Sequence, residues 1–348
     1  MQRMLSFTSV RVAEVVDEES SPLAPDEVRI STLYSGISAG TELTAYRGTN
    51  AYMNKKWDEG RRLFVDGSTS FQYPVNGWGY EEVGEVTEIG TDVTKLEVGD
   101  VVWGTWGHRT ETIQKEERAA KRILQEGADV RVGIFSQIGA IALNVVLDAD
   151  IHVGETVVVF GLGVPGQLVA QLARLNGARV IGVDGVASRR ELALKLGADL
   201  VLDPAQQGIA ERVRDLTDGR GADVVLEVTG NYLALHEAIR TVAYNSRVCV
   251  AGFMQGEGVG LKLGEEFHHN RVQLVCAQIS GVNPTIDHRW NEYRLQRTFI
   301  DLAVAGKVNV TDLITHEMPL EKGGEAFAML DTATADVLQV LLDARASA

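Results

Sequence analysis

The chain has 348 residues, of which 45% are hydrophobic and 23% are charged, and its formal net charge is −15. This composition is ordinary for a globular enzyme, and a chain of this length usually forms two domains. The negative charge argues against nucleic acid or an anionic membrane surface as a partner, since both would repel the chain.

Residues 1 to about 130 are predicted to be rich in β-strands, because polar and apolar residues alternate there. The predicted strands are 6–14, 27–34, 82–89 and 100–105. Residues 50–73 are polar and aromatic without a clear period, so we expect a long surface segment of the kind that is often functional. Residues 131–149 show a helical period and would lead into a second domain.

The stretch 156–184 has the order strand, glycine turn, helix, strand. Residues 156–160 are β-branched or aromatic and predict a buried parallel strand. The turn GLGVPG (161–166) follows without a spacer, and a proline is tolerated at the start of a helix because its nitrogen has no hydrogen to leave unpaired. A second predicted strand, 179–183, is followed directly by Asp184.

This order of elements is typical of a dinucleotide-binding fold. The first glycine of such a turn permits the tight bend, the second lets the backbone approach a pyrophosphate, and the third lets helix and strand pack closely. The helix N-terminus offers N–H groups and a positive dipole to the phosphates. Asp184 would bind the ribose hydroxyls and repel the 2′-phosphate of NADP, so we predict NAD(H); Arg189, just downstream, could weaken that preference.

Strands and helices continue to alternate as far as residue 281. The further strands are predicted at 200–202, 224–228, 248–251 and 272–277. Six strands alternating with helices predict a doubly wound parallel sheet in an α/β fold. The only cysteines, Cys249 and Cys276, fall in two of these strands, so we expect buried thiols and no disulfide. Beyond residue 281 we expect a helix at 294–305, another near 320 and a closing strand at 337–342.

Two features that the sequence lacks indicate the cellular compartment of the protein. No stretch approaches eighteen consecutive apolar residues, and the N-terminus lacks the apolar core of a signal peptide. We therefore expect a cytoplasmic protein without a membrane span.

Short motifs along the whole chain resemble the landmarks of the medium-chain dehydrogenase/reductase superfamily. They are GISAGTE (36–42), GYE (79–81) with VGEV (83–86), GDVV (99–102), the glycine turn, LGAD (196–199) and LITH (313–316). The version SGISAGTE with GYEEVGEV is most similar to the branch around bacteriochlorophyllide hydroxyethyl dehydrogenase. The resemblance implies a β-rich, GroES-like catalytic domain of residues 1–135 and 282–348, and a six-stranded Rossmann domain of residues 136–281.

The chain departs from its family at the metal site. Zinc-dependent members bind the catalytic metal through a Cys, a His and a further Cys or Asp, and landmark spacing places Ser38, Tyr80 and Ser136 at those positions. Neutral hydroxyls are poor zinc ligands. The family's four-cysteine structural zinc lobe is absent too, because residues 1–248 contain no cysteine. We therefore expect no metal; the alternative is an ion held by residues 42, 81 and 108.

Without zinc, other groups must polarise the substrate oxygen and move its proton. The resemblance places Tyr80 where the ligand histidine would point into the cleft, and Thr41 at the family's proton-relay hydroxyl. His108 could shuttle a proton near neutral pH, and Glu81 and Glu42 could orient or charge-balance these groups. We predict Tyr80, Thr41, His108 and Glu81 as catalytic. The alternatives are a tyrosine packed in the core and a histidine that only forms structural hydrogen bonds.

The predicted cofactor contacts gather at the carboxyl ends of the parallel strands, where ligands bind in such sheets. They are Gly161, Gly163, Val164, Pro165, Gly166, Asp184, Arg189, Thr229, Gly252, Phe253 and Ile279.

The sequence therefore predicts an NAD(H)-dependent oxidoreductase that interconverts a secondary alcohol and a ketone of a small-molecule substrate without catalytic zinc. Two alternatives stay open: zinc-free reduction of an activated carbon–carbon double bond, as in an enone, and a non-catalytic nucleotide-binding protein on the same scaffold. We also expect a homodimer that pairs through the apolar strand 272–277.

Overall fold

The structure, a computed structural model, describes residues 1–348 except 68, 70, 207, 280, 333–336 and 346–348. Its contacts divide the chain into a first unit, Met1–Gln137 with Thr311–Ala348, and a second unit, Ile138–Val310. Residues 282–310, which we expected in the catalytic domain, lie in the second unit. The reason is the packing of α8 (Glu292–Val304) on α3 (Ser136–Ala149), so close that a Cβ on Gly139 would lie 2.0 Å from the ring of Phe299.

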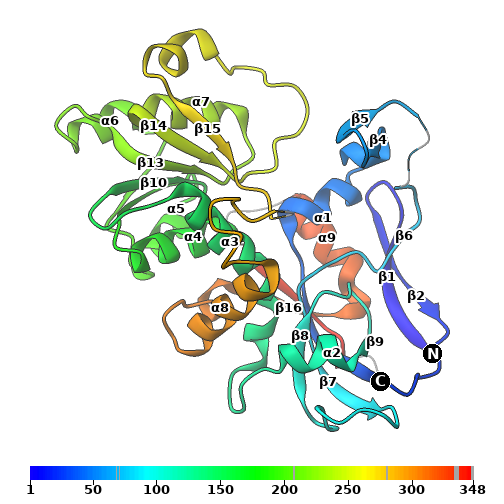
Figure 1. The fold of residues 1–348 in the computed structure, drawn as a ribbon. Helices are drawn as coiled ribbons and strands as arrows, with labels where there is room; N and C mark the ends of the chain where they lie inside the picture. Colours follow the sequence, from blue (N-terminus) through cyan, green and yellow to red (C-terminus); the bar gives the residue numbers. More distant parts are fainter. Residues whose placement is uncertain (68, 70, 207, 280, 333–336, 346–348) are drawn as a thin grey trace. The chain divides into compact units, whose positions relative to one another are not determined.

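The first unit contains a large sheet and a small sheet (Figure 1). The large sheet has the order β16-β17-β3-β7-β8, with β9 also paired to β3. Its strands are β3 (Glu27–Gly36), β7 (Glu82–Ile89), β8 (Val101–Gly104), β9 (Glu111–Lys115), β16 (Ile314–Pro319) and β17 (Gln339–Asp343). The C-terminal part of the chain therefore completes a sheet that the N-terminal part begins.

The small sheet corrects one expectation. The predicted strand 6–14 is a hairpin of β1 (Gln2–Ser9) and β2 (Val12–Glu18), with β6 (Val75–Asn76) on the other side of β1. The turn contains Arg11 at a φ of 59°. A two-residue turn leaves the alternation of polar and apolar residues in phase, so the sequence pattern does not reveal the reversal.

Residues 50–73 form short elements: η1 (Ala51–Met53) and a hairpin of β4 (Lys56–Asp58) and β5 (Leu63–Val65). Positions 68 and 70 of this segment lie outside the described residues.

An aromatic cluster fixes α1 (Ala39–Tyr46) in the first unit. The ring of Phe7 on β1 lies 5.9 Å from the ring of Tyr46 and 4.9 Å from that of Phe327, in edge-to-face geometry. Phe327 belongs to α9 (Gly323–Asp331), which packs on α1. Edge-to-face pairs add to the free energy gained by burying the rings. This packing positions the motif that leads into α1, residues 36–42.

The second unit confirms the doubly wound fold. Its six strands are all parallel and have the order β12-β11-β10-β13-β14-β15, the 3-2-1-4-5-6 arrangement of the Rossmann fold. They are β10 (Thr156–Phe160), β11 (Arg179–Val183), β12 (Leu200–Leu202), β13 (Ala222–Glu227), β14 (Val242–Val250) and β15 (Gln273–Cys276). The sequence predicts all six, and the bounds of β10, β11 and β12 agree.

Helices cover both faces of this sheet (Figure 1). Residues of α6 (Ile209–Asp215) and α7 (Tyr232–Thr241) pack with Val158 and Phe160 of β10 in one buried cluster. Because side chains alternate along a strand, Val157 and Val159 face the other side, where α4 (Val164–Leu175) and α5 (Ala187–Lys195) lie. The turns that follow β10, β13 and β14 therefore share one edge of the sheet.

β15 is the edge strand, and this corrects the expectation for one cysteine. Cys249 on β14 is buried, whereas Cys276 on β15 is exposed, because an edge strand has a neighbour on one side only. Leu274 of the same strand is 38% exposed. A homodimer formed through this strand stays a prediction.

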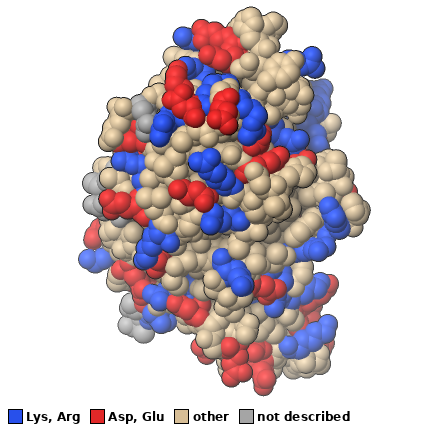
Figure 2. Space-filling view, turned by 90° about the vertical axis from the view of Figure 1, so that its left-hand side faces the viewer, with Lys and Arg blue, Asp and Glu red and all other residues tan. Residues whose placement is uncertain are grey.

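The helical segment Val130–Ala149 is long and apolar enough to cross a membrane by length and composition, with a mean hydropathy of 1.7 over its most apolar window. We expected no such stretch. Of that window, 78% is buried inside the protein, as in the core helix of a globular fold. On the face shown in Figure 2, acidic and basic side chains are interspersed and form no patch of a single sign.

Candidate functional site

Three hydroxyl groups of the first unit form a hydrogen-bonded chain. Ser38 is the N-cap residue of α1, and its Oγ makes a short hydrogen bond with the phenol of Tyr80, two residues before β7. The Tyr80 phenol in turn donates to Oγ1 of Thr41, 3.2 Å away. The structure thus brings together two of the predicted catalytic residues, Tyr80 and Thr41, with Ser38.

The phenol of Tyr80 keeps its proton at neutral pH. Burial of the phenol, reinforced by the negative charge of Glu81, raises the pKa of Tyr80 above its usual value of 10.0, although the hydrogen bonds from Ser38 and Thr41 oppose the shift. A phenol that stays neutral is a proton donor and a poor ligand for a metal ion.

Glu42 connects this chain of hydroxyls to a buried histidine. Its Oε1 accepts a hydrogen bond of 2.9 Å from the backbone N–H of Ser38, and its Oε2 lies 2.6 Å from Nε2 of His108. Glu42 and His108 are both fully buried. Because the carboxylate holds the first residue of the α1 cap, the position of Ser38 depends on this pair.

The other nitrogen of His108 reaches a second carboxylate through a hydroxyl. Nδ1 lies 2.6 Å from Oγ of Ser35, which donates to Oε1 of Glu82 at 3.2 Å, and Oε2 of Glu82 accepts from the N–H of Trp106. Burial lowers the pKa of His108, but the charges of Glu42 and Glu82 outweigh it, so the net pKa is raised above 6.5. An imidazolium donates from both nitrogens, which satisfies every contact of this network.

The ring of His108 packs against the backbone that carries Tyr80. The imidazole is fully buried, and a Cβ on Gly79, the residue before Tyr80, would lie 3.1 Å from its Cε1 and Nε2. The backbone that carries Tyr80 therefore rests on this ring. We predicted His108 as a proton shuttle; the structure places it against Glu42 and Ser35 and out of contact with solvent.

Glu81 is fully buried and only partly hydrogen-bonded. Its Oε2 accepts from Nε2 of Gln339 at 3.1 Å, while its Oε1 has no hydrogen-bond partner among the described residues. Burial, then the charges of Glu42 and Glu82, raise the pKa of Glu81 well above 4.5. Burial therefore favours the neutral carboxylic acid over the carboxylate, and the role of Glu81 in orienting or charge-balancing the site stays a prediction.

The residues at the family's zinc-ligand positions do not fit zinc. Ser38 and Tyr80 are hydrogen-bonded to each other, and Ser136 supplies a third neutral hydroxyl, which is fully buried. Zinc sites in proteins are built from thiolates, imidazoles and carboxylates. The alternative set of Glu42, Glu81 and His108 is not assembled either, because Nε2 of His108 is occupied by Glu42, and Oε2 of Glu81 by Gln339.

One other group of possible metal ligands occurs in the part of the chain that the structure describes. His236, Glu265 and Glu266 of the second unit bring their ligand atoms within 4.8 Å of one another. Cations already contact both carboxylates: Nε of Arg240 lies 3.3 Å from Glu266, and Nζ of Lys262 lies 3.6 Å from Glu265. These ion pairs already neutralise the two carboxylates that would have to balance the charge of a metal ion.

The glycine turn of the second unit has the geometry that a dinucleotide requires. Gly161 has a φ of 90°, and a Cβ on Gly166 would lie 1.8 Å from the carbonyl oxygen of Gly161, so α4 packs directly on the end of β10. A Cβ on Gly163, in contrast, would meet nothing within 4 Å. Gly163 caps α4, with Val164 and Pro165 in the first turn, and so leaves open space at the helix N-terminus for a phosphate group.

Asp184 follows β11 and is half-buried beside the turn. Its Oδ2 accepts from the N–H of Leu162 at 2.7 Å, and its Oδ1 accepts from the N–H of Val186 at 2.8 Å. Each carboxylate oxygen keeps a second lone pair for a ribose hydroxyl. The backbone carbonyl of the predicted contact Arg189 accepts from Gln167 of α4, which ties the start of α5 to the turn. The residues present fit a nicotinamide dinucleotide.

The other predicted cofactor contacts lie at the same edge of the sheet. A Cβ on Gly161 would lie 2.7 Å from Cγ2 of Thr229, and a Cβ on Gly252 would lie 2.2 Å from the nitrogen of Gly230. Phe253 is 49% exposed, and Ile279 follows the edge strand β15.

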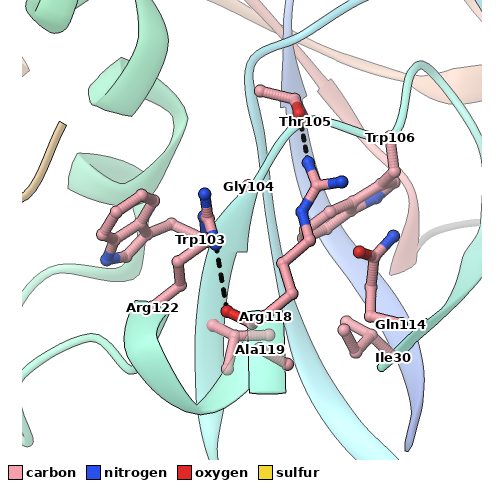
Figure 3. A pocket seen from close by; sticks show the side chains of 10 residues that line it. Ile30, Trp103, Gly104, Thr105, Trp106, Gln114, Arg118, Ala119 and Arg122 are labelled. Atoms are coloured by element: carbon pink, nitrogen blue, oxygen red, sulfur yellow. Dashed lines mark hydrogen bonds between the residues drawn. The ribbon is translucent and has the colours of Figure 1, made fainter. Parts of the chain in front are cut away.

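The pocket in Figure 3 is not large enough to be the substrate site. It lies beside β8 in the first unit, where Arg118 donates to Thr105 and Arg122 lies over the ring of Trp103. Its volume is about 10 Å³, room for a single water molecule at most.

Three residues whose hydrogen bonds fix the site of the first unit were not predicted from the sequence: Ser35, Glu82 and Gln339. A signal was present for Glu82, since a carboxylate inside the run GYEEVGEV begins a strand whose first residues are buried. Ser35 and Gln339 gave none, because a serine or a glutamine in a strand is equally common on an exposed face.

Comparisons with known proteins agree on the family. A family described as zinc-binding dehydrogenase matches residues 163–292, a range within the second unit that contains none of the positions 38, 80 and 136. D-Guloside 3-dehydrogenase of Escherichia coli K12 is 31% identical over 333 residues, which cover 93% of this chain and 95% of the relative. L-Threonine 3-dehydrogenase of Pyrococcus horikoshii is 29% identical, covering 91% of this chain and 92% of the relative.

Solved structures show the same fold. 2R,3R-Butanediol dehydrogenase of Bacillus subtilis superposes with a TM-score of 0.78 at 21% identity, over 99% of each chain. A protein of Sinorhizobium meliloti 1021, assigned as a zinc-binding dehydrogenase and solved with NADP bound, superposes with a TM-score of 0.79 at 21% identity, over 99% of each chain.

The buried state of Glu81 predicts a pH effect on stability. Its pKa is raised in the folded protein, so between about pH 4.5 and the folded pKa the folded state holds a proton that the unfolded state has released. The free energy of unfolding therefore falls as the pH rises through this window, by up to about 1.4 kcal/mol per pH unit for this group. We expect Glu81→Gln to make that fall shallower.

The measurement is urea denaturation of both proteins at several values between about pH 5 and about pH 8. Glu126→Gln, an exposed position in the same unit, is the matched control and should follow the wild type. His108 and Glu82, whose pKa values are also raised, act in the same direction and leave a residual slope in the variant. Parallel curves for wild type and Glu81→Gln would contradict the prediction.

Proposed function

The chain belongs to the medium-chain dehydrogenase/reductase superfamily of zinc-type alcohol dehydrogenase-like enzymes, and from this premise we propose that it interconverts a secondary alcohol and a ketone with NAD(H) and without catalytic zinc. A nicotinamide-dependent oxidation of an alcohol, or its reverse, is the reaction that the names of the relatives describe. The use of NAD(H), the absence of zinc and the proton donor are the proposal. The likeness to the bacteriochlorophyllide branch stays a prediction.

The hydrogen-bonded chain of Ser38, Tyr80 and Thr41 carries the proposal. Two of its members occupy positions at which zinc-dependent relatives have metal ligands. A neutral phenol there supplies a hydrogen bond and a proton to a substrate oxygen, and it has no charge with which to hold a metal. This assignment of Tyr80, Thr41, Glu81 and His108 to the reaction rests on the resemblance and on their geometry.

In the reducing direction, the phenol of Tyr80 donates its proton to the carbonyl oxygen. The hydroxyl of Ser38 or Thr41 passes a proton to the phenol and takes one from water in the same relay, so that each ketone reduced consumes one proton from solvent and leaves every hydroxyl neutral. The nicotinamide, when bound, supplies hydride to the carbonyl carbon or takes it from the carbinol carbon. The raised pKa of Tyr80 keeps the phenol protonated at neutral pH, and Glu42 and His108 position the residues through their buried hydrogen bonds.

The names of the relatives support a polar substrate. D-Guloside 3-dehydrogenase and L-threonine 3-dehydrogenase each place their chemistry at carbon 3 of a hydroxylated molecule. We propose that this chain also acts on a secondary hydroxyl of a polar small molecule, such as a sugar derivative. The hydroxyl groups of Ser38, Tyr80 and Thr41 suit such a substrate because they can donate to one oxygen and accept from another.

For the proposed reaction, we first predict that Tyr80→Phe lowers kcat for ketone reduction at least roughly tenfold, because the variant has no proton to donate. The Kd for NADH should not change, since the cofactor residues lie in the other unit. Steady-state kinetics and NADH fluorescence titration measure the two quantities. Tyr244→Phe, at a tyrosine that is 65% exposed, is the matched control. An unchanged kcat would remove Tyr80 from the mechanism.

The second prediction concerns zinc. Protein purified without chelators should contain substoichiometric zinc by elemental analysis, and 1,10-phenanthroline should not reduce its activity, because three hydroxyls offer no ligand set. The variant that combines Ser38→Cys, Tyr80→His and Ser136→Cys is the positive control and should retain zinc. One zinc ion per wild-type chain would refute the proposal.

The third prediction concerns the cofactor. Wild-type protein should bind NADH more tightly than NADPH, because the carboxylate of Asp184 repels a 2′-phosphate. Asp184→Asn should raise the affinity for NADPH and so narrow the difference. Asp215→Asn, at an exposed aspartate of the same unit, is the control. Fluorescence titration with both nucleotides gives the affinities, and a clear preference of the wild type for NADPH would contradict this reading.

A further inference from the structure

A buried carboxylate stands at the centre of the edge where the dinucleotide-binding strands end. Glu227 is the last residue of β13, which pairs with β10 on one side and β14 on the other. Its side chain is fully buried, although the rest of the strand is apolar apart from Asp223. A carboxylate is costly to bury, so its hydrogen bonds indicate what it does there.

The carboxylate of Glu227 holds the turn that follows its own strand. Oε1 accepts from the N–H of Thr229 at 2.7 Å and, in a short contact, from the Thr229 hydroxyl; Oε2 accepts from the N–H of Gly230 at 3.4 Å. All the donors are backbone or hydroxyl groups of two successive residues. Burial raises the pKa of Glu227, and these hydrogen bonds oppose the shift.

The backbone of Glu227 holds the neighbouring turn as well. Its carbonyl oxygen accepts from the N–H of Ala251 at 2.9 Å and from the N–H of Gly252 at 3.0 Å. A Cβ on Gly252 would lie 2.6 Å from Oε2 of Glu227, and a Cβ on Gly230 would lie 2.9 Å from the carbonyl oxygen of Phe253. The turns after β13 and β14 therefore meet at this residue and have no room to shift independently.

The order of the strands assigns these two turns to one half of the cofactor. Asp184 ends β11, on one side of β10, and the glycine turn that takes the pyrophosphate follows β10 itself. An extended dinucleotide with its adenosine ribose at Asp184 and its pyrophosphate at β10 must continue across β13 and β14. The nicotinamide half therefore lies over the turns that Glu227 holds.

We propose that Glu227 is a positioning residue for the nicotinamide half of the cofactor: it fixes the turns of residues 228–230 and 251–253 and leaves the adenosine half to Asp184. The proposal rests on nicotinamide binding by the second unit. It does not depend on Tyr80 or on the absence of zinc.

The test is Glu227→Gln. An amide has one acceptor oxygen, so the variant keeps the shape of the side chain but cannot accept from both Thr229 and Gly230. We expect the Kd for NADH to rise at least roughly tenfold, as for the loss of a hydrogen bond to a charged group. The Kd for ADP, which carries only the adenosine half and the diphosphate, should stay unchanged. Titration calorimetry with each nucleotide measures both.

Each outcome decides the proposal. A selective loss of NADH affinity, partly restored in Glu227→Asp because that variant keeps both acceptor oxygens, supports it. Unchanged NADH affinity, or an equal loss for NADH and ADP, overturns it. If Glu227→Gln does not fold, Glu227→Asp decides in its place: its shorter side chain reaches the turn less well, so a smaller but still selective loss of NADH affinity is expected.

Glu257→Gln, an exposed position, is the matched control and should bind both nucleotides as the wild type does. The result is separable from that of Tyr80→Phe. Tyr80→Phe changes turnover with NADH affinity intact, whereas Glu227→Gln changes NADH affinity first.

Discussion

The site of the first unit depends on one buried histidine. Nε2 of His108 lies 2.6 Å from Oε2 of Glu42 and Nδ1 lies 2.6 Å from Oγ of Ser35, which donates to Glu82, and all four side chains are buried. Loss of one partner of a buried ion pair typically costs about 3–5 kcal/mol, because the remaining charge is left without a counter-charge. The pair fixes the α1 cap through the N–H of Ser38 and supports the backbone of Gly79. The hydroxyl chain therefore owes its geometry to a histidine that is itself fully buried.

In the second unit, carboxylates are held in place by the hydrogen-bond donors of turns and not by a histidine. Asp184 and Glu227 each follow or end a parallel strand, and each is satisfied by hydrogen-bond donors of a turn. Charge-assisted hydrogen bonds to backbone N–H groups are strong, and they make the position of the turn part of the carboxylate's stability. The two carboxylates lie on opposite sides of β10, and in our proposal each fixes the turn that binds one half of the cofactor.

The sequence predicted the second unit well because its signals are local. Hydrophobic runs mark the strands, and Gly161, Gly163 and Gly166 mark positions at which the backbone itself is constrained. The first unit was harder to predict. The reversal between β1 and β2 leaves the alternation in phase, and Cys276 is exposed only because β15 is an edge strand. The hydrogen bonds of His108 to Glu42 and Ser35 join residues 66 and 73 positions apart in sequence, and no periodicity reports which buried carboxylate meets which ring.

The balance of charge supports our proposal that the site works without a metal. Three buried carboxylates, Glu42, Glu81 and Glu82, lie around one histidine, so full ionisation with a protonated His108 would leave two uncompensated negative charges. Burial raises the pKa values of Glu81 and Glu82, which favours the neutral form of both, and the raised pKa of Tyr80 prevents a further charge from forming. Protons thus supply the compensation that a divalent ion supplies elsewhere. A site whose charge is compensated by protonation is sensitive to pH. In the proposed reaction, the phenol of Tyr80 carries the proton that the ketone oxygen takes up.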